Sequence, residues 1–346
     1  MITTESPSTK QDKETRVCAV IVTFNRLALL KEAFAAVRNQ TRPADTIIVV
    51  DNGSTDGTSE WLATVIGAGV RVITQANLGG AGGFYTGLQA GYESGADWFW
   101  CMDDDTIPDP ECLARILAVE VRVLDEAGPA TPGWISSVVR WTDGTAHRMN
   151  EPKVESFLRW GPDVLRKGFI PAQWCSFVSV AISRQAVAAC GLPLKDMFIW
   201  YDDVEYTARI TAAGFAGVVA LESQVEHRTA TNYAPDVEDL APNNLWRFRY
   251  AFRNEVVVLK TLNRNQPNKL YLQFGKLMLR RLFLMLRAGK FGYLPVAISQ
   301  GFRGLSFPMD ILFPQAPTPA VSDLHQNVAL PSQSLSTPSL TSPTAS

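Results

Sequence analysis

Residues 98–105 read Trp-Phe-Trp-Cys-Met-Asp-Asp-Asp, an apolar run that ends in three adjacent carboxylates. Such a run predicts a buried strand that carries Asp103, Asp104 and Asp105 to the edge of a sheet. Adjacent like charges repel and are costly to desolvate unless a positive charge meets them. Carboxylate oxygens suit Mg²⁺ or Mn²⁺, and such an ion at a sheet edge is a good partner for a diphosphate. The pattern also fits a turn and a helix cap, because Pro108-Asp109-Pro110 follows.

The residues before this strand alternate between strand and helix patterns. Continuous apolar runs predict buried parallel strands at residues 17–22, 46–50 and 70–74. Apolar residues at helical spacing follow each of them. This alternation predicts an α/β fold with a doubly wound, mostly parallel sheet. Ligands of such sheets bind at the carboxyl ends of the strands, where Phe24-Asn25, Asp51 and the three aspartates are predicted to lie.

The rest of the chain is expected to add further strands and a helix to this domain and then to become helical and basic. Strands are predicted at 134–141, 177–183 and 218–221, and a helix is predicted to run from Asp202 to just before Gly214. From Asn244 onward the chain becomes helical and basic. We therefore expect a disordered leader (1–15), an α/β domain (16–240), a basic helical extension (241–313) and a disordered tail rich in Pro, Ser and Thr (314–346).

The composition of the chain argues against a nucleic-acid-binding protein and against a membrane-spanning one. The chain has 346 residues and a net charge of −2, which gives no case for nucleic-acid binding. Its five cysteines form no CxxC pair and are expected to be buried thiols in a reducing compartment. The polar N-terminus does not fit a secretory signal, and no apolar stretch reaches the ~18 residues that a spanning helix requires.

Two features on the expected binding edge fit a nucleotide ligand. The glycine-rich stretch 77–83 would let backbone N–H groups approach a phosphate at the start of a helix, although sharp turns use glycine too. Asp51 could accept hydrogen bonds from a ring N–H or a ribose hydroxyl. Alternatively, Asp51 forms the turn that begins with Asn52-Gly53.

A second acidic group lies in the first turn of a predicted helix. Asp202, Asp203 and Glu205 could compensate the helix dipole, or one of them could act as a general base. His227 follows a strand-like segment and sits among polar residues. Its neutral imidazole could complete a metal site begun by Asp103 and Asp105, or it could be a surface histidine.

Taken together, these motifs resemble glycosyltransferase family 2. The matching segments are Val22-Thr23-Phe24-Asn25-Arg26, Val49-Val50-Asp51-Asn52-Gly53-Ser54-Thr55-Asp56-Gly57, Asn77-Leu78-Gly79-Gly80-Ala81-Gly82-Gly83-Phe84 and Met102-Asp103-Asp104-Asp105. The segment Trp200-Tyr201-Asp202-Asp203-Val204-Glu205, with His227 after it, is similar to bacterial galactofuranosyltransferases, from which it departs by the inserted Tyr201. The likeness extends more loosely to rhamnosyltransferases.

The resemblance implies a GT-A fold, a nucleotide-diphosphate sugar donor and inversion at the anomeric carbon. It implies that Asp103, Asp105 and His227 bind Mn²⁺ or Mg²⁺, and that Asp203 takes the proton from the acceptor. Acceptor contacts are expected from Asp202, Glu205, Trp200 and Trp174, although core packing is an alternative for both tryptophans. Donor contacts are expected from Thr23, Phe24, Asn25, Arg26, Asp51, Asn77, Gly79, Gly80, Gly82, Gly83 and Asp104.

The favoured reaction is galactofuranosyl transfer from UDP-galactofuranose to a lipid-linked or cell-envelope glycan. Rhamnosyl transfer from dTDP-rhamnose, a sugar-nucleotidyltransferase and a non-catalytic binding module are the alternatives. Residues 256–309 contain leucines and nine Lys or Arg but no acidic residue, a composition typical of an interfacial segment or of a solvated basic face. The expected location is peripheral, at the cytoplasmic face of the bacterial inner membrane.

Overall fold

The computed structural model describes residues 15–126, 131–156, 160 and 162–313. The leader predicted at 1–15, apart from Thr15, and the tail predicted at 314–346 lie outside the described residues. The five cysteines are all buried and free, as expected.

A single ten-stranded sheet forms the centre of the molecule, in the order β3-β2-β1-β4-β9-β6-β10-β8-β7, with β5 paired to β10. Seven strands run in one direction and three run opposite to them. The first group is β1 (Val17–Thr23), β2 (Thr46–Asp51), β3 (Val70–Thr74), β4 (Trp98–Asp103), β6 (Pro132–Arg140), β7 (Lys153–Val154) and β10 (Ala216–His227). The second is β5 (Thr106–Pro108), β8 (Phe169–Trp174) and β9 (Val180–Ser183).

Helices cover both faces of this sheet, because the inner strands are apolar on both sides. One face packs against α1 (Leu27–Arg38), α2 (Thr58–Val65) and α4 (Cys112–Glu126). The other packs against α3 (Gly79–Glu93), α5 (Arg184–Cys190) and α6 (Asp202–Ala212). Strand β1 contributes alternate residues to the two cores, which confirms the predicted doubly wound α/β class.

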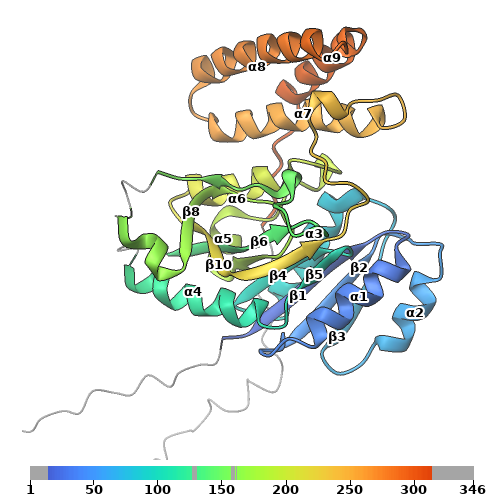
Figure 1. The fold of residues 1–346 in the computed structure, drawn as a ribbon, viewed down its shortest axis with the longest axis vertical. Coiled ribbons are helices and arrows are strands. Elements are labelled where there is room, and N and C mark those ends of the chain that lie inside the picture. Colours follow the sequence, from blue (N-terminus) through green and yellow to red (C-terminus); the bar gives the residue numbers. More distant parts are fainter. Residues whose placement is uncertain (1–14, 127–130, 157–159, 161, 314–346) are drawn as a thin grey trace, which may run out of the picture.

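Three helices form a further layer after the sheet domain: α7 (Leu245–Leu262), α8 (Pro267–Arg287) and α9 (Leu294–Leu305). Figure 1 shows them at the top of the view, beyond α6 and α3. They share their own apolar core around Phe248, Phe252 and Met285. Among the described residues, no helix is both long enough and apolar enough to cross a bilayer.

Three local predictions differ from the structure. The strand predicted at 177–183 begins only at Val180, as β9. The strand predicted at 218–221 is part of the longer β10, which continues past an irregularity between Ala220 and Gln224, so His227 ends a strand. The polar residues Glu222, Ser223 and Gln224 interrupt the apolar pattern and hide this continuation. The glycine stretch was expected to be a loop, but helix α3 already begins at Gly79.

The reason for that early helix start is close packing. A Cβ on Gly83 would lie 2.3 Å from the Val22 Cγ1 atom, so the glycine lets α3 rest directly on β1. Gly79 has a φ of +73°, and a Cβ there would lie 2.1 Å from the carbonyl oxygen of Phe198. Steric fit therefore explains these two glycines without a ligand.

Candidate active site

The site lies where the sheet brings several strand ends to one edge. Strands β1, β2, β4 and β10 run in the same direction and end at Thr23, Asp51, Asp103 and His227. After Asp103 the chain turns into β5, which pairs with the end of β10 and sets Thr106 opposite His227. This turn places Asp105 within reach of both Arg26, after β1, and His227, at the end of β10.

Asp105 contacts two positively chargeable side chains at this edge. Its carboxyl is buried, and its Oδ1 atom lies 3.2 Å from the Nε2 atom of His227. Its Oδ2 atom accepts a hydrogen bond from the Arg26 guanidinium. Burial raises the pKa of Asp105, but His227 and Arg26 outweigh that effect and bring the pKa down to about 2. Asp105 is therefore an anion at neutral pH.

The hydrogen bonds of His227 fix which ring nitrogen faces Asp105. Its Nδ1 atom lies 2.7 Å from the Asn150 Oδ1 atom, and the Asn150 amide nitrogen donates to Ser176 Oγ. An amide oxygen accepts only, so Nδ1 carries a proton and Nε2 faces Asp105, with a lone pair in the neutral ring and an N–H in the charged ring. Asp105 Oδ1 is buried without a hydrogen-bond donor. A proton or a metal cation between Nε2 and Oδ1 would satisfy both atoms.

The other two aspartates of the triplet have different surroundings. Asp104 is buried and accepts hydrogen bonds from the Thr23 hydroxyl (2.8 Å) and the Phe24 backbone N–H (3.3 Å). Burial and the neighbouring Asp105 raise its pKa to about 6. Burial, Asp105, Asp104 and Asp202 together raise the pKa of Asp103 well above its usual range. The triplet thus carries more negative charge than Arg26 neutralises.

Asp202 and Asp203 begin α6 as predicted, and they are close enough to the triplet for Asp202 to act on Asp103. Burial raises the pKa of Asp203 to about 6, while backbone N–H groups of Val204 and Phe177 oppose the rise. The Val204 N–H lies 2.7 Å from its Oδ1 atom. A carboxylate with this pKa is largely ionised at neutral pH and is basic enough to accept a proton.

The segment before α6, residues Phe198–Tyr201, has a strained backbone, and we call it the α6 strap. Phe198, Trp200 and Tyr201 have φ values of 68°, 63° and 66°, in the left-handed region that side chains with a Cβ rarely adopt. Such residues cost on the order of 1–3 kcal/mol each and persist only when their surroundings hold them. The strap therefore fixes the direction in which α6 presents its first residues.

The residues expected to bind the donor surround the same edge, but several are already engaged by the protein. Asp51 has no exposed surface and accepts hydrogen bonds from the Ser54 N–H (2.9 Å) and the Ser59 hydroxyl (2.7 Å). Asn25 binds the Thr55 N–H through its side-chain oxygen, and Asn77 caps the N–H of Gly79. Gly79, Gly80, Gly82 and Gly83 form the first turns of α3. Phe24 and Arg26 remain substantially exposed.

Three predicted acceptor residues have partners within the fold. Glu205 has no exposed surface, and its oxygens bind Arg209 (3.0 and 3.1 Å) and the Thr261 hydroxyl (2.9 Å). Trp200 packs edge-on against Phe248 of α7. Trp174 lies beside the last turn of α6, in a hollow that also includes Thr211 and Ala212. Contacts within the fold explain all three side chains.

Comparison with known proteins decides the family. The model named glycosyl transferase family 2 matches residues 18–164. The galactofuranosyltransferase GlfT1 of Mycobacterium tuberculosis is 31% identical over 223 residues, 61% of this chain and 69% of that protein. The galactofuranosyltransferase GlfT1 of Mycolicibacterium smegmatis is 29% identical over 218 residues, 62% of this chain and 72% of that protein.

The chain belongs to glycosyltransferase family 2. Among solved structures it is similar to GalNAc-T7 with UDP, GalNAc and Mn²⁺, with a TM-score of 0.51 and 14% identity, over 71% of this chain and 48% of that one. This chain thus spans about half of that structure, and at this identity the likeness shows the fold alone. The GT-A fold expected from the motifs is confirmed, as is the glycosyltransferase class.

Two residues near the site, Asn150 and His147, contact His227 and are marked by none of the sequence motifs. Asn150 orients His227, and it lies in the short 3₁₀ turn η1 (Arg148–Asn150). His147 stacks on His227 with ring centroids 4.4 Å apart and hydrogen-bonds Thr229 at 2.8 Å. Burial, followed by the charge of His227, lowers the pKa of His147 to about 4, which keeps it neutral. No periodic pattern marks this segment, so the sequence offers little signal beyond the presence of a histidine.

The buried Glu205–Arg209 pair gives a stability prediction. Glu205→Gln leaves the Arg209 guanidinium without its counter-charge, and we expect the free energy of unfolding to fall by about 3 kcal/mol. Urea unfolding followed by circular dichroism measures this change.

The matched control is Glu222→Gln, which breaks an exposed pair with Arg115 and should change the free energy of unfolding by less than about 1 kcal/mol. Adding Arg209→Met to Glu205→Gln should recover part of the loss, since no unpaired charge remains buried. Wild-type unfolding of Glu205→Gln together with a raised KM for the acceptor would instead support the original acceptor-binding role.

Proposed function

We propose that this protein is a metal-dependent, inverting glycosyltransferase that moves galactofuranose from UDP-galactofuranose to a lipid-linked or cell-envelope glycan. The observation that carries the proposal is the unsatisfied Asp105–His227 pair at the same edge as Asp203, the candidate base. The names of the two mycobacterial relatives favour galactofuranose as the sugar.

The residues at the edge fit a divalent ion. Asp103, Asp105 and His227 offer carboxylate and imidazole ligands, a donor set that suits Mn²⁺ and is compatible with Mg²⁺. In the described part of the chain, no three such side chains are already arranged as a metal cluster. The site therefore lacks a complete protein cage, and donor phosphate oxygens would supply further ligands. When bound, the ion neutralises charge on the departing nucleoside diphosphate.

The protein's own groups would perform the remaining work. Asp203 would take the proton of the acceptor hydroxyl as that oxygen attacks the anomeric carbon from the side opposite the leaving group, which inverts the centre. The N-terminus of α3 would present its positive dipole end to the diphosphate, while the N–H groups of Gly79 and Ala81 are bound to Asn77 and Phe198 within the fold. Arg26, whose side chain is 46% exposed, could turn from Asp105 to a phosphate. Thr23, Phe24 and Asn25 would line the nucleoside.

The base assignment predicts the behaviour of Asp203→Asn. The amide cannot accept the acceptor proton, so kcat should fall by about 100-fold or more while the affinity for UDP stays unchanged. Steady-state turnover and titration calorimetry with UDP measure the two effects. In the wild type, kcat/KM should decline as the pH drops through about 6, because the carboxylate of Asp203 becomes protonated below its pKa.

The control for this variant is Asp143→Asn, which alters a carboxylate in an exposed turn where it binds Thr145. This change should leave both turnover and UDP affinity at wild-type values. Near-normal turnover by Asp203→Asn would show that the base is another group.

The choice of donor and the need for metal are tested together. With Mn²⁺ and a lipid-linked saccharide, we expect acceptor-dependent release of UDP from UDP-galactofuranose, and a chelator should abolish it. Titration calorimetry should show that His227→Ala weakens Mn²⁺ binding in the presence of UDP about 10-fold or more.

Other outcomes of the same assay separate the alternatives. Turnover with dTDP-rhamnose alone would make the protein a rhamnosyltransferase with the same mechanism. Release of diphosphate in place of a nucleoside diphosphate would indicate a sugar-nucleotidyltransferase. Tight donor binding without any turnover would indicate a binding module.

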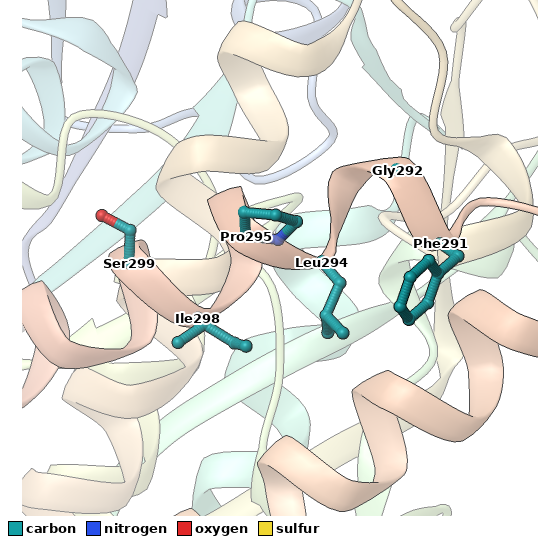
Figure 2. Close-up of a pocket in the computed structure, with 6 residues that line it drawn as sticks. All are labelled: Phe291, Gly292, Leu294, Pro295, Ile298 and Ser299. Atoms are coloured by element: carbon teal, nitrogen blue, oxygen red, sulfur yellow. The ribbon is translucent and has the colours of Figure 1, made fainter.

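The outer surface of the helical layer supports a membrane partner. Four exposed apolar side chains lie on one side of α8: Leu272, Leu279, Phe283 and Leu286. At 100° per residue, Lys276, Arg280 and Arg287 fall on the adjoining strip of the same helix. An apolar cavity of about 470 Å³ lies nearby at the start of α9, lined by Phe291, Gly292, Leu294, Pro295, Ile298 and Ser299 (Figure 2). An apolar strip beside a basic strip fits the surface of an anionic bilayer.

We therefore propose peripheral binding at the cytoplasmic face of the bacterial inner membrane, where a lipid-linked acceptor would be available. The double variant Leu279→Gln/Phe283→Gln should float markedly less with vesicles that contain phosphatidylglycerol, because both side chains are more than 60% exposed in the protein. Lys276→Glu/Arg280→Glu should lose flotation on these vesicles too, at about 1 kcal/mol per basic residue removed.

A matched control uses Val121→Gln, which removes an equally exposed apolar side chain from α4 of the sheet domain. It should float like the wild type. Equal flotation of all variants would exclude the α8 surface as the membrane contact.

A further inference from the structure

The backbone carbonyls of the α6 strap are held from three sides. The Phe198 carbonyl accepts from the Ala81 N–H of α3 (3.2 Å), and the Tyr201 carbonyl accepts from the Glu205 N–H of α6 (2.8 Å). The carbonyls between them, of Ile199 and Trp200, accept from the side chain of Asn254 on α7. The strap thus links the two helices of the candidate site to the C-terminal layer.

Asn254 of α7 binds the strap through its side-chain amide. Its side chain has no exposed surface, and its Nδ2 atom lies 2.8 Å from the Trp200 oxygen, 3.0 Å from the Ile199 oxygen and 2.9 Å from the Met197 oxygen. Its Oδ1 atom accepts from the Arg253 Nε atom at 2.8 Å. Because Arg253 can only donate, this bond fixes the amide with its nitrogen toward the strap.

Arg253 reinforces the same contact from the neighbouring position of α7. Its Nη2 atom donates to the carbonyls of Asp196 (3.0 Å) and Met197 (2.9 Å), in the turn that leads into the strap. Two adjacent residues of α7 therefore bind four of the five carbonyls from Asp196 to Trp200, and Ala81 of α3 binds the fifth, that of Phe198. A helix that only packed against the sheet domain would have no need of this pattern.

We propose that Asn254 is a positioning residue for glycosyl transfer: it holds the strained α6 strap so that Asp203 faces the acceptor. The inference rests on the proposed function of Asp203 and extends it, since it makes α7 part of the catalytic apparatus. Left-handed backbone at three non-glycine residues relaxes unless its carbonyls are held, and relaxation would rotate the first turn of α6. A shift of this kind at a base lowers turnover far more than it lowers donor binding.

The test compares two buried asparagines of the full-length protein. Asn254→Asp replaces the donating NH₂ by an oxygen that repels the strap carbonyls at unchanged size, and Asn254→Ser is a smaller variant in case the aspartate hinders folding. Asn263→Ala is the control, because Asn263 is also buried but binds Leu259 and Gln273 at the other end of α7. Thermal unfolding compares the stability of all three variants with that of the wild type.

Hydrogen exchange and kinetics give independent readouts. We expect both Asn254 variants to exchange faster than the wild type in peptides that cover residues 196–207, and the control to exchange normally there. We expect kcat to fall by about 100-fold in Asn254→Asp, with the KM for the donor and the affinity for UDP within about twofold of the wild type.

Three results would overturn the inference: unchanged exchange at 196–207, kcat within about threefold of the wild type, or equal losses of kcat and UDP affinity. A matching loss of kcat in Asn263→Ala would equally assign the effect to general destabilisation. If the wild type turns over no donor, the proposed function fails, while the exchange measurement still decides whether Asn254 holds the strap.

Discussion

The structure depends on one electrostatic constraint, which is the excess of negative charge at the end of β4. Asp103, Asp104 and Asp105 leave the central strand together, and burial with mutual repulsion raises the pKa of the first two. Arg26 from the loop after β1 and His227 from the end of β10 meet this charge from either side. Elements far apart in the sequence are therefore tied to one point of the sheet edge, and a dication would complete the same balance.

Residues outside the acidic cluster fix the orientation of the His227 ring. The Asn150 amide oxygen accepts a hydrogen bond from Nδ1–H, so Nε2 is the ring nitrogen that faces Asp105. His147 stacks on the ring and stays neutral, so it adds no positive charge that would repel a cation. The segment between β6 and β8, which contributes little to the main sheet, thereby determines the ligand character of the histidine.

The strand ends could be predicted from the sequence for a simple physical reason. Strands buried on both faces read as apolar runs, and the first polar residue after each run marks the carboxyl edge, as at Asp51 and Asp103. Helix spacing also predicts a partner for Glu205, because Arg209 lies four residues later and the two side chains form a buried ion pair.

Other parts of the site depend on tertiary contacts that carry no local signal. The direction of β8 places Trp174 near the far end of α6, and a strand pattern is the same in either direction. Asn150 belongs to a short irregular turn, and its importance comes only from the histidine that folds against it. The glycine-rich stretch 77–83 predicts a close approach to a phosphate, yet close backbone packing also requires glycine at positions 79 and 83.

The C-terminal helices contact the segment that leads into the candidate site. By composition they look like an appendage, but the strained strap costs free energy that hydrogen bonds from α7 must offset if α6 is to keep its direction. Helix α7 holds the strap on one side and packs with α8 and α9 on the other. The helices proposed to lie on the bilayer are thus in direct contact with the helix that orients the base. If α8 lies on the bilayer, the layer formed by α7, α8 and α9 would set the distance between the membrane surface and Asp203, where a lipid-linked acceptor would react.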